Sequence, residues 1–304
     1  MKPYLATDLK MLNRQSVYRL LEKKDELSRA EIARITKISI PTVMKIVAHF
    51  LETGIVSEAG DGVTAMGRKP QMLRFEPSAY YSVGVEYEGD YLRAGMVDLR
   101  GGIDFVLQER VIGQFQEVVN HQLLSLVEKV IAQSDVERAR IAGIGMGVPA
   151  VVDVERVTVS AAPMVGILED IDCKPILEGL SEQLKLPMYL ENDTNAAALG
   201  EYAIGLHDAT TDLLYVSLGS GLGAGLIVQG KLCRGRQNFG GEIGFMVFDR
   251  SFETNPARRG WLEDHVSLQT ICAKYPFFAL LMEGKARAED GEDDLLKLAD
   301  EIGG

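Results

Sequence analysis

Residues 188–197 read Met-Tyr-Leu-Glu-Asn-Asp-Thr-Asn-Ala-Ala, and the chain changes character at their centre. Residues 188–191 form a short, largely apolar run, as expected of a strand. Ala196 begins an Ala-rich stretch of helical character. Asn192 and Asp193 stand between the two, where the strand ends. A strand that passes into a helix through one polar turn is typical of an α/β protein.

Further strands and helices are predicted on both sides of this stretch. Long apolar runs bounded by turn residues predict strands, and apolar residues at helical spacing predict helices. Their alternation predicts an α/β body. The predicted strands are residues 81–85, 92–98, 102–108, 141–148 and 213–218, and the predicted helices are residues 115–134, 175–184 and 196–203.

The first 54 residues have a different pattern, which predicts three helices. The first helix covers residues 11–24. The second helix begins at a capping box that starts at Ser28, and it ends near Lys37. Ser39 is the predicted N-cap of the third helix, which runs to about residue 52. The predicted core faces of the first and third helices consist of Leu12, Val17, Leu20 and Leu21, and of Val43, Ile46, Val47 and Phe50.

The second and third of these helices are joined by a tight turn, which is the layout of a helix-turn-helix. The N-terminal end of the later helix enters the major groove of DNA in such domains. We therefore expect Ser39, Thr42 and Lys45 to contact bases or phosphates. The alternative is a helical bundle used for dimerisation.

Two short strands follow the third helix and predict a wing. Residues 55–58 and 71–75 are separated by a Gly-rich loop that carries Arg68 and Lys69. Adjacent cations suit a narrow, negative minor groove. We expect Arg68 and Lys69 to bind DNA, with simple solvation of the two side chains as the alternative.

The charge of the chain is segregated in the same way. The whole chain carries −12, but residues 1–75 contain 13 Lys and Arg against eight Asp and Glu, a net of +5, which leaves −17 for the rest. An acidic body should be repelled by DNA, whereas a basic head should be attracted to it. The Pro-containing stretch at 75–78 suggests a DNA-binding domain over residues 1–76 and a second domain over residues 77–304.

Composition excludes several classes of protein. With 46% hydrophobic and 25% charged residues, global disorder is excluded. Apolar runs are far shorter than the roughly 20 residues of a membrane span, and the first residues lack the pattern of a signal peptide. Three scattered Cys residues predict neither a disulfide framework nor a metal knuckle. We expect a cytoplasmic protein without membrane contact.

Three stretches of the body carry residues capable of chemistry. Asn192 and Asp193 can hydrogen-bond hydroxyl groups, or Asp193 can accept a proton. The alternative is simple helix capping by Asp193 or Thr194. Residues 219–225 read Gly-Ser-Gly-Leu-Gly-Ala-Gly, which can cradle a phosphate or form a tight hairpin. Glu242 lies between glycines in residues 240–244, where backbone can approach a ligand closely.

Together and in this order these stretches resemble the ROK family of repressors, open reading frames and sugar kinases. The resemblance rests on residues 143–149, 191–197, 219–225 and 234–244, and it extends over essentially the whole chain. It implies an actin-like body of two α/β lobes with a sugar in the cleft between them. Members that carry a helix-turn-helix are sugar-responsive transcription regulators.

The resemblance also implies which residues bind the sugar. Asn192 and Asp193 would bind sugar hydroxyls, with Asp193 as a vestigial general base. Glu242 and Glu263 would accept further hydroxyl hydrogen bonds, and Gly147 would offer backbone groups. No catalytic residue is expected.

Departures from the family pattern imply that no nucleotide is bound. Kinase members carry a DxGxT-like phosphate-binding hairpin, in which this chain has Glu86, Glu88 and Asp90. One charge pair at 4 Å amounts to about 4 kcal/mol at an effective dielectric constant near 20, so the extra carboxylates should repel ATP.

Zinc is not expected for a similar reason. Phe245 replaces the family's His ligand, while Thr254, Pro256 and Trp261 replace its Cys ligands. We expect no cofactor and no metal, and packing of Phe245, Phe248 and Trp261 in place of the zinc. The chain also stops early for the family, so that either a natively shortened C-terminal lobe or a truncated chain is expected.

The sequence therefore predicts a transcriptional regulator, with repression as the expected sign. It should act as a homodimer or higher homo-oligomer on double-stranded operator DNA, with a small sugar as effector. One alternative is an ATP-dependent sugar kinase with an appended DNA-binding head. The other is a constitutive DNA-binding protein whose body only dimerises.

Overall fold

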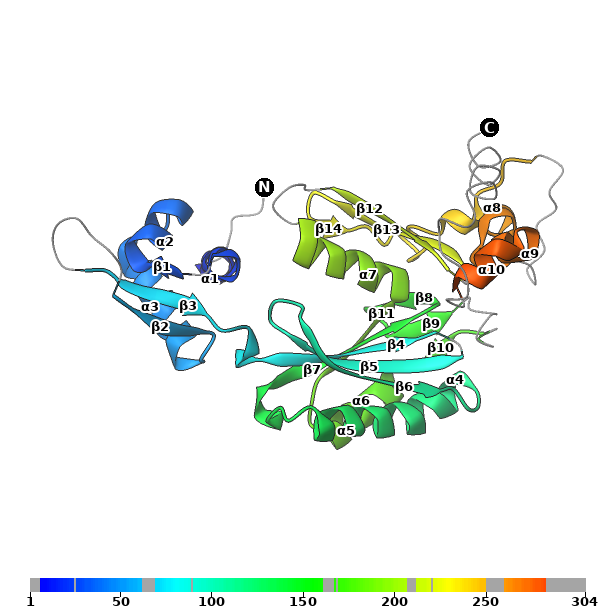
Figure 1. Cartoon of the computed structure of the whole chain (residues 1–304), viewed down its shortest axis with the longest axis horizontal. Coiled ribbons are helices and arrows are strands. Elements are labelled where there is room, and N and C mark those ends of the chain that lie inside the picture. Colours follow the sequence, from blue (N-terminus) through cyan, green and yellow to red (C-terminus); the bar gives the residue numbers. More distant parts are fainter. Residues whose placement is uncertain are drawn as a thin grey trace.

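A small N-terminal head and a larger body make up the computed structural model (Figure 1). The structure describes residues 6–24, 26–61, 69–88, 90–160, 167, 169–206, 212–219, 221–249 and 260–282. The predicted mixture of strands and helices is confirmed. Among the helices so described, none combines the length and apolar character that a membrane crossing requires.

The head contains three helices and a three-stranded antiparallel sheet. Every helix and strand predicted for residues 11–75 is present, and the first helix begins earlier than expected. An additional short strand, β1, pairs with β3 and completes the sheet. The elements are α1 (Ala6–Lys23), β1 (Glu26–Ser28), α2 (Arg29–Thr36), α3 (Ile40–Glu52), β2 (Val56–Asp61) and β3 (Gln71–Phe75).

The helix ends of the head follow the sequence signals. The Ser28 hydroxyl accepts a hydrogen bond from the Glu31 backbone N–H at 3.3 Å, and the Glu31 carboxylate accepts one from the Ser28 backbone N–H at 2.9 Å. This capping box satisfies two donors that a helix start leaves free. Lys37 ends α2 with φ +60°, and Gly54 follows α3 with φ +74°.

The core of the head is formed by the predicted apolar faces with one exception. Val17 and Leu21 of α1 pack with the four predicted residues of α3, all of which are buried. Leu12 is 43% exposed and does not belong to this core. Leu12 and Leu21 are nine residues apart, which is about two and a half helical turns, so Leu12 lies on the other side of α1 and its assignment to the core face was wrong.

The main sheet of the body has the strand order β11-β7-β4-β5-β6. β4, β5 and β6 form an antiparallel meander, and β7 and β11 run parallel to β4. α5 and α6 lie together on one side of this sheet, below it in Figure 1. These elements are β4 (Tyr81–Tyr87), β5 (Tyr91–Asp98), β6 (Ile103–Arg110), α4 (Phe115–Glu117), α5 (Leu124–Gln133), β7 (Ile141–Val148), α6 (Lys174–Leu184) and β11 (Met188–Asn192).

Two features of the region around the main sheet differ from the prediction. The helix expected over residues 115–134 contains a π-helical segment, Val118–Leu123, between α4 and α5. A separate antiparallel sheet was missed because its strands are only two or three residues long. Its strands are β8 (Val151–Asp153), β9 (Thr158–Ser160) and β10 (Ile171–Asp172).

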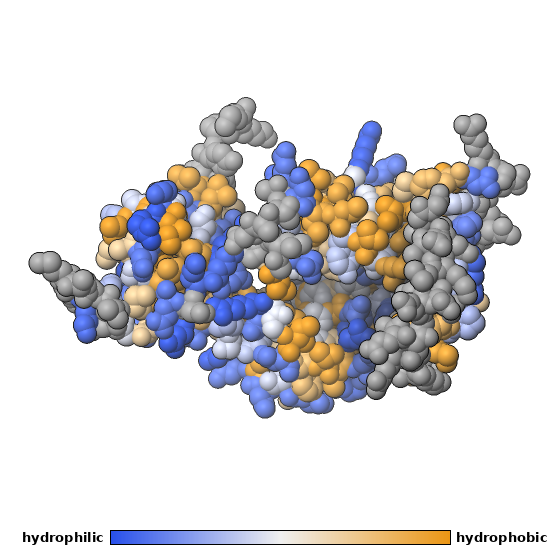
Figure 2. All heavy atoms as spheres, turned by 45° about the horizontal axis from the view of Figure 1, so that its top comes forward, coloured by the Kyte–Doolittle hydropathy of each residue, from blue (hydrophilic) through white to orange (hydrophobic). Residues whose placement is uncertain are grey.

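A second antiparallel sheet, β12-β13-β14, lies across α7 from the main sheet (Figure 1). α7 contacts strands of both sheets. The opposite face of the second sheet exposes Leu214, Val216 and Leu218, and Figure 2 shows hydrophobic residues on the surface of the body as well as on the head. The remaining elements are α7 (Asp193–Glu201), β12 (Leu213–Leu218), β13 (Leu222–Val228), β14 (Lys231–Leu232), α8 (Trp261–Val266), α9 (Leu268–Lys274) and α10 (Pro276–Met282).

The head and the body meet at the turn that follows β5. The Tyr18 hydroxyl donates a hydrogen bond to the Leu99 carbonyl at 3.4 Å, and the Arg100 guanidinium lies 5.4 Å from the centre of the Phe75 ring. Burial, with the nearby Glu22 and Asp98 carboxylates, raises the pKa of Tyr18 to about 12. The tyrosine is therefore a neutral hydrogen-bond donor in this joint at ordinary pH.

Candidate functional site

The junction between β11 and α7 is built around the Asn192 side chain. Its Oδ1 accepts a hydrogen bond from the Asn195 backbone N–H at 2.9 Å, and its Nδ2 donates one to the Ala150 carbonyl at 3.1 Å. Asn192 is thus the N-cap of α7 and also ties that helix to the segment after β7. The alternative of helix capping by Asp193 or Thr194 is therefore wrong, because the cap is Asn192 and Asp193 is the first helical residue.

Asp193 is a half-buried carboxylate at the start of α7. Its Oδ1 accepts hydrogen bonds from the Thr194 backbone N–H at 2.6 Å and from the Thr194 hydroxyl at 3.2 Å. Burial raises the pKa of Asp193 against those hydrogen bonds, and the charges of Glu86 and Glu88 raise it further. A side chain at Gly147 would place its Cβ 3.3 Å from the Asp193 Cα, so Gly147 allows β7 to lie this close.

Glu242 is positioned by a glycine whose backbone is pressed against β13. Gly241 has φ +96°, and a Cβ there would overlap the Ala224 carbonyl. The Ala224 backbone N–H donates a hydrogen bond to the Gly241 carbonyl at 2.8 Å. Only glycine combines this conformation with this contact. Burial raises the pKa of Glu242, with further contributions from the charges of Asp193 and Glu263.

Glu263 enters from α8 and completes a group of three carboxylates. Its Oε2 accepts a hydrogen bond from the Leu222 backbone N–H at 3.0 Å. The acidic cluster, as we call it below, consists of Asp193, Glu242 and Glu263, which come from three separate segments of the chain. The charges of Asp193 and Glu263 both raise the pKa of Glu242. Carboxylates grouped in this way offer several acceptors for the hydroxyl groups of a ligand. The structure thus brings together three of the five predicted ligand residues, with Gly147 and Asn192 against Asp193.

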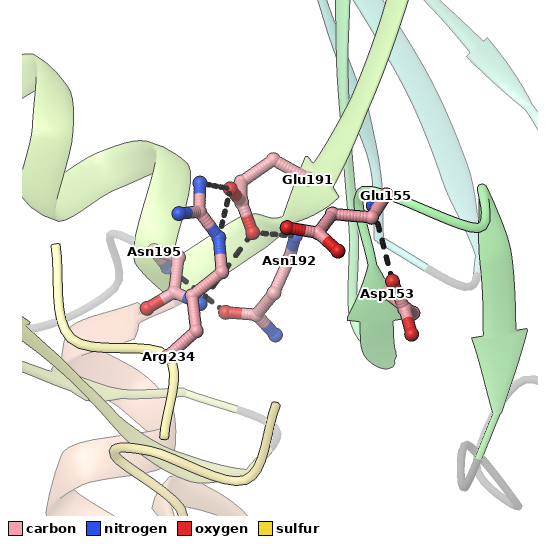
Figure 3. A network of polar contacts seen from close by, with 6 residues as sticks. All are labelled: Asp153, Glu155, Glu191, Asn192, Asn195 and Arg234. Atoms are coloured by element: carbon pink, nitrogen blue, oxygen red, sulfur yellow. Dashed lines mark hydrogen bonds and ion pairs between the residues drawn. The ribbon is translucent and has the colours of Figure 1, made fainter. Parts of the chain in front are cut away.

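An ion pair next to this cluster was not predicted (Figure 3). Both Arg234 Nε, at 3.1 Å, and a terminal Arg234 nitrogen donate to Glu191 Oε2. Glu191 Oε1 accepts from the Asn192 backbone N–H at 3.0 Å and lies 3.5 Å from Asn195 Nδ2. The pair joins the end of β11 to the chain after β14, 43 residues further on. No local sequence pattern predicts this ion pair, because Glu191 and Arg234 are neighbours only in the folded chain.

The β4–β5 hairpin is less negative than the sequence predicted. Arg93 forms ion pairs with Glu86 at 2.8 Å and with Glu88 at 3.9 Å. This arginine offsets part of the expected repulsion of a phosphate group. Both carboxylates nevertheless raise the pKa of Asp193, so that their field still reaches the acidic cluster.

The glycine-rich stretch 219–225 begins at the turn between β12 and β13, and its residues 222–225 belong to β13. The Gly219 N–H donates to the Gly221 carbonyl at 2.9 Å, and the Gly219 carbonyl accepts from the Leu268 N–H at 3.1 Å. A Cβ at Gly225 would overlap that of Ala198, so this glycine is required for the packing of α7. These observations support the tight-hairpin interpretation of the stretch.

The side chains at the family's zinc positions do not fit zinc. Phe245 is 59% exposed, and the Trp261 ring packs edge-on against Phe248 with 5.6 Å between ring centres. The expected aromatic packing is therefore present between Phe248 and Trp261 and not at Phe245, although Phe248, like Phe245, is largely exposed. Thr254 and Pro256 lie outside the described residues.

The DNA-binding face of the head is centred on the start of α3. Ser39 and Lys45 are exposed, while Thr42 is half-buried with its hydroxyl 2.9 Å from that of Ser39. Lys69 is exposed, and Arg68 lies outside the described residues. The sequence analysis missed Ile40 and Met44, which are each 54% exposed on the same helix. A helical projection would not have found them, because Ile40 lies three residues before Val43 and Met44 three before Val47, at the edge of the buried face of α3.

Comparison with known proteins agrees with this architecture. A ROK family profile matches residues 82–277, and a winged helix-turn-helix DNA-binding profile matches residues 12–57. A xylose repressor from Caldicellulosiruptor bescii is 31% identical over 239 residues, which are 78% of this chain and 59% of that protein. The chain thus spans less than two thirds of the length of this curated relative.

Solved structures give the same fold. A ROK family transcriptional regulator, a homologue of the E. coli MLC protein, aligns with a TM-score of 0.71 at 22% identity over 92% of this chain and 70% of its own. A ROK family glucokinase from Streptomyces griseus, in complex with glucose and AMPPNP, aligns with a TM-score of 0.55 at 27% identity over 68% of this chain and 66% of its own.

Replacement Asp193→Asn is expected to stabilise the protein at pH 7. The pKa of Asp193 is raised in the folded state, so stability falls as pH rises from the ordinary carboxyl pKa to the raised one, and the cost stays constant above it. Asparagine removes this cost and keeps both hydrogen bonds from Thr194. Thermal melts should show a higher Tm for the variant at pH 7, by about 2–4 °C per kcal/mol, and no gain well below pH 4. An equal gain at every pH would contradict this.

Replacement Arg234→Met is expected to destabilise the protein by about 1–3 kcal/mol, because it leaves the Glu191 carboxylate half-buried without its cation. Arg236→Met is the matched control, since Arg236 is exposed two residues away and its loss should cost less than about 0.5 kcal/mol. Urea unfolding of both variants measures the difference. Equal losses would show that the Glu191–Arg234 pair contributes nothing specific.

Proposed function

The chain belongs to the ROK family, and from this membership we propose that it is a sugar-responsive DNA-binding transcriptional regulator that acts as a repressor. Residues 1–76 form its DNA-binding domain, and residues 77–304 form its sensing and dimerisation domain. The observation that carries the proposal is the presence in one chain of a helix-turn-helix and an acidic cluster. The relative named a xylose repressor supports a sugar as effector.

The proposed DNA contacts are Ser39, Thr42, Lys45, Arg68 and Lys69. The first three lie at the start of α3, the second helix of the helix-turn-helix, which enters the major groove in such domains. The net charge of +5 in residues 1–75 supports attraction to DNA, while the acidic body stays off it. Two heads in a dimer would bind the two halves of a palindromic operator.

The proposed sugar contacts are Gly147, Asn192, Asp193, Glu242 and Glu263. Carboxylates can accept hydroxyl hydrogen bonds without any change of the ligand, so that binding needs no catalytic step. Asn192 has one amide hydrogen and one lone pair beyond its two structural hydrogen bonds, which leaves it able to contact a hydroxyl group. A polar ligand would also relieve the destabilising crowding of the three carboxylates.

The β4–β5 hairpin connects the two proposed sites. One end carries Glu86 and Glu88, whose charges act on Asp193, and the other end carries Leu99, which contacts Tyr18 of the head. A ligand that draws the acidic cluster together would shift this hairpin and, with it, the head. In our proposal such a shift changes the population of dimers whose heads have the spacing of the operator.

A sugar kinase is the second candidate function. The likeness to a ROK family glucokinase favours it, as does a half-buried Asp193 whose raised pKa suits a general base. The Glu86 and Glu88 carboxylates oppose it. An ATP-dependent phosphorylation assay with a panel of monosaccharides separates the two candidates, because turnover would show that the protein is an enzyme.

Thermal melts with a panel of monosaccharides, D-xylose included, test the sensor. A bound sugar should raise Tm, by the equivalent of about 2.7 kcal/mol at 100 times its Kd, and the shift should vanish in Asp193→Asn. Glu201→Gln, an exposed acid at the other end of α7, is the control that should keep the shift. A panel without any shift would favour a constitutive DNA-binding protein.

The salt dependence of operator binding tests the DNA contacts. Lys45→Ala and Lys69→Ala should each lower the slope of log K against log salt by about one, because each removes one phosphate contact. Lys231→Ala, an exposed lysine of the body, should leave the slope unchanged. Fluorescence anisotropy on an operator duplex gives the slopes. Unchanged slopes in both head variants would show that neither lysine contacts a phosphate.

A further inference from the structure

Two exposed side chains near the start of α3 are apolar, whereas the DNA contacts predicted there are polar or basic. Val43, Ile46, Val47 and Phe50 form the buried face, each with at most 6% exposure. Ile40 and Met44, one turn apart, lie at the edge of this buried face and are each 54% exposed. They occupy the first and fifth positions of the helix, within the half that enters the major groove in a helix-turn-helix.

The side chains around Ile40 and Met44 suit a negatively charged partner. Lys45 is exposed beside them, and the only acidic residue of α3 is Glu52, at the far end of the helix. The head as a whole carries +5. Two apolar side chains in such surroundings are placed to contact apolar groups on a polyanion.

The sequence of this helix also limits how it can read bases. Arg or Lys contacts guanine through hydrogen bonds, and Asn or Gln contacts adenine. Residues 38–48 contain no Arg, Asn or Gln, and Lys45 is the one residue among them that belongs to these types. The Ser39 and Thr42 hydroxyls lie 2.9 Å apart, so that part of their hydrogen-bonding capacity is used between them.

We propose that Ile40 and Met44 read the 5-methyl groups of thymines in the operator. The thymine methyl is the one apolar group that the four bases present in the major groove, and apolar side chains recognise it by contact. Each half-site would carry thymines under the first turns of α3. This inference rests on the proposed DNA-binding function and adds the chemistry by which the operator is recognised.

Replacement of thymine by deoxyuridine tests the proposal, because it removes the methyl group and leaves base pairing intact. The full chain is first used to select its binding site from random duplexes, and each thymine of the selected site is then replaced singly. At the contacted positions deoxyuridine should weaken binding about fourfold, the factor that corresponds to ~0.8 kcal/mol for one buried methyl-sized group. Thymines outside the half-site cores should show no effect.

Two variants locate the effect on the protein. Ile40→Ala and Met44→Ala should each bind the thymine and deoxyuridine duplexes equally at one position. Met11→Ala is the control, since Met11 is 59% exposed on α1 and the variant should keep the full methyl dependence. The measured quantity is a ratio of two affinities, so a general loss of affinity does not affect the comparison.

Each of the remaining outcomes overturns either this inference or the DNA-binding function on which it rests. If a site is selected but no position distinguishes thymine from deoxyuridine, the inference fails while DNA binding stands. If no duplex is enriched, the proposed DNA-binding function fails and the inference with it. If the alanine variants change sedimentation of the DNA-free protein and keep the methyl dependence, Ile40 and Met44 belong to a contact between two copies, which overturns the inference.

Discussion

The junction of β11 with α7 is the constraint on which the rest of the body depends. The Asn192 side-chain amide caps α7 and hydrogen-bonds the segment after β7. The adjacent Glu191 forms an ion pair with Arg234, which follows β14. α7 then contacts strands of both sheets. Because a single short segment makes all these contacts, the position of Asp193 relative to the second sheet follows from it.

The glycines of the body matter as spacers around this junction. Gly147 lets β7 approach Asp193, Gly225 lets β13 approach α7, and Gly241 rests on the Ala224 carbonyl. Because none of these glycines has a side chain, the neighbouring segments can pack closely. This close packing brings together the carboxylates of separate segments. Burial, together with the charges of Asp193 and Glu263, raises the pKa of Glu242, so that holding these carboxylates together has an electrostatic cost.

Much of the architecture could be predicted because it depends on local signals. The capping box at Ser28, the buried face of α3 and the parallel strand β7 follow from caps and apolar periods that act within one element. The errors fall where those signals are weak. β1 has three residues, and the π-helical segment Val118–Leu123 keeps the apolar pattern of an ordinary helix.

The sequence by itself determined the order of the elements, the segregation of charge and the candidate carboxylates, because caps, periods and residue types are properties of short segments. Only the tertiary structure decided that Arg234 pairs with Glu191, that Arg93 offsets the charge of the β4–β5 hairpin, and that Ile40 and Met44 stay exposed. These outcomes depend on which distant segments pack against one another, and a local pattern does not specify the partner of a face or of a charge.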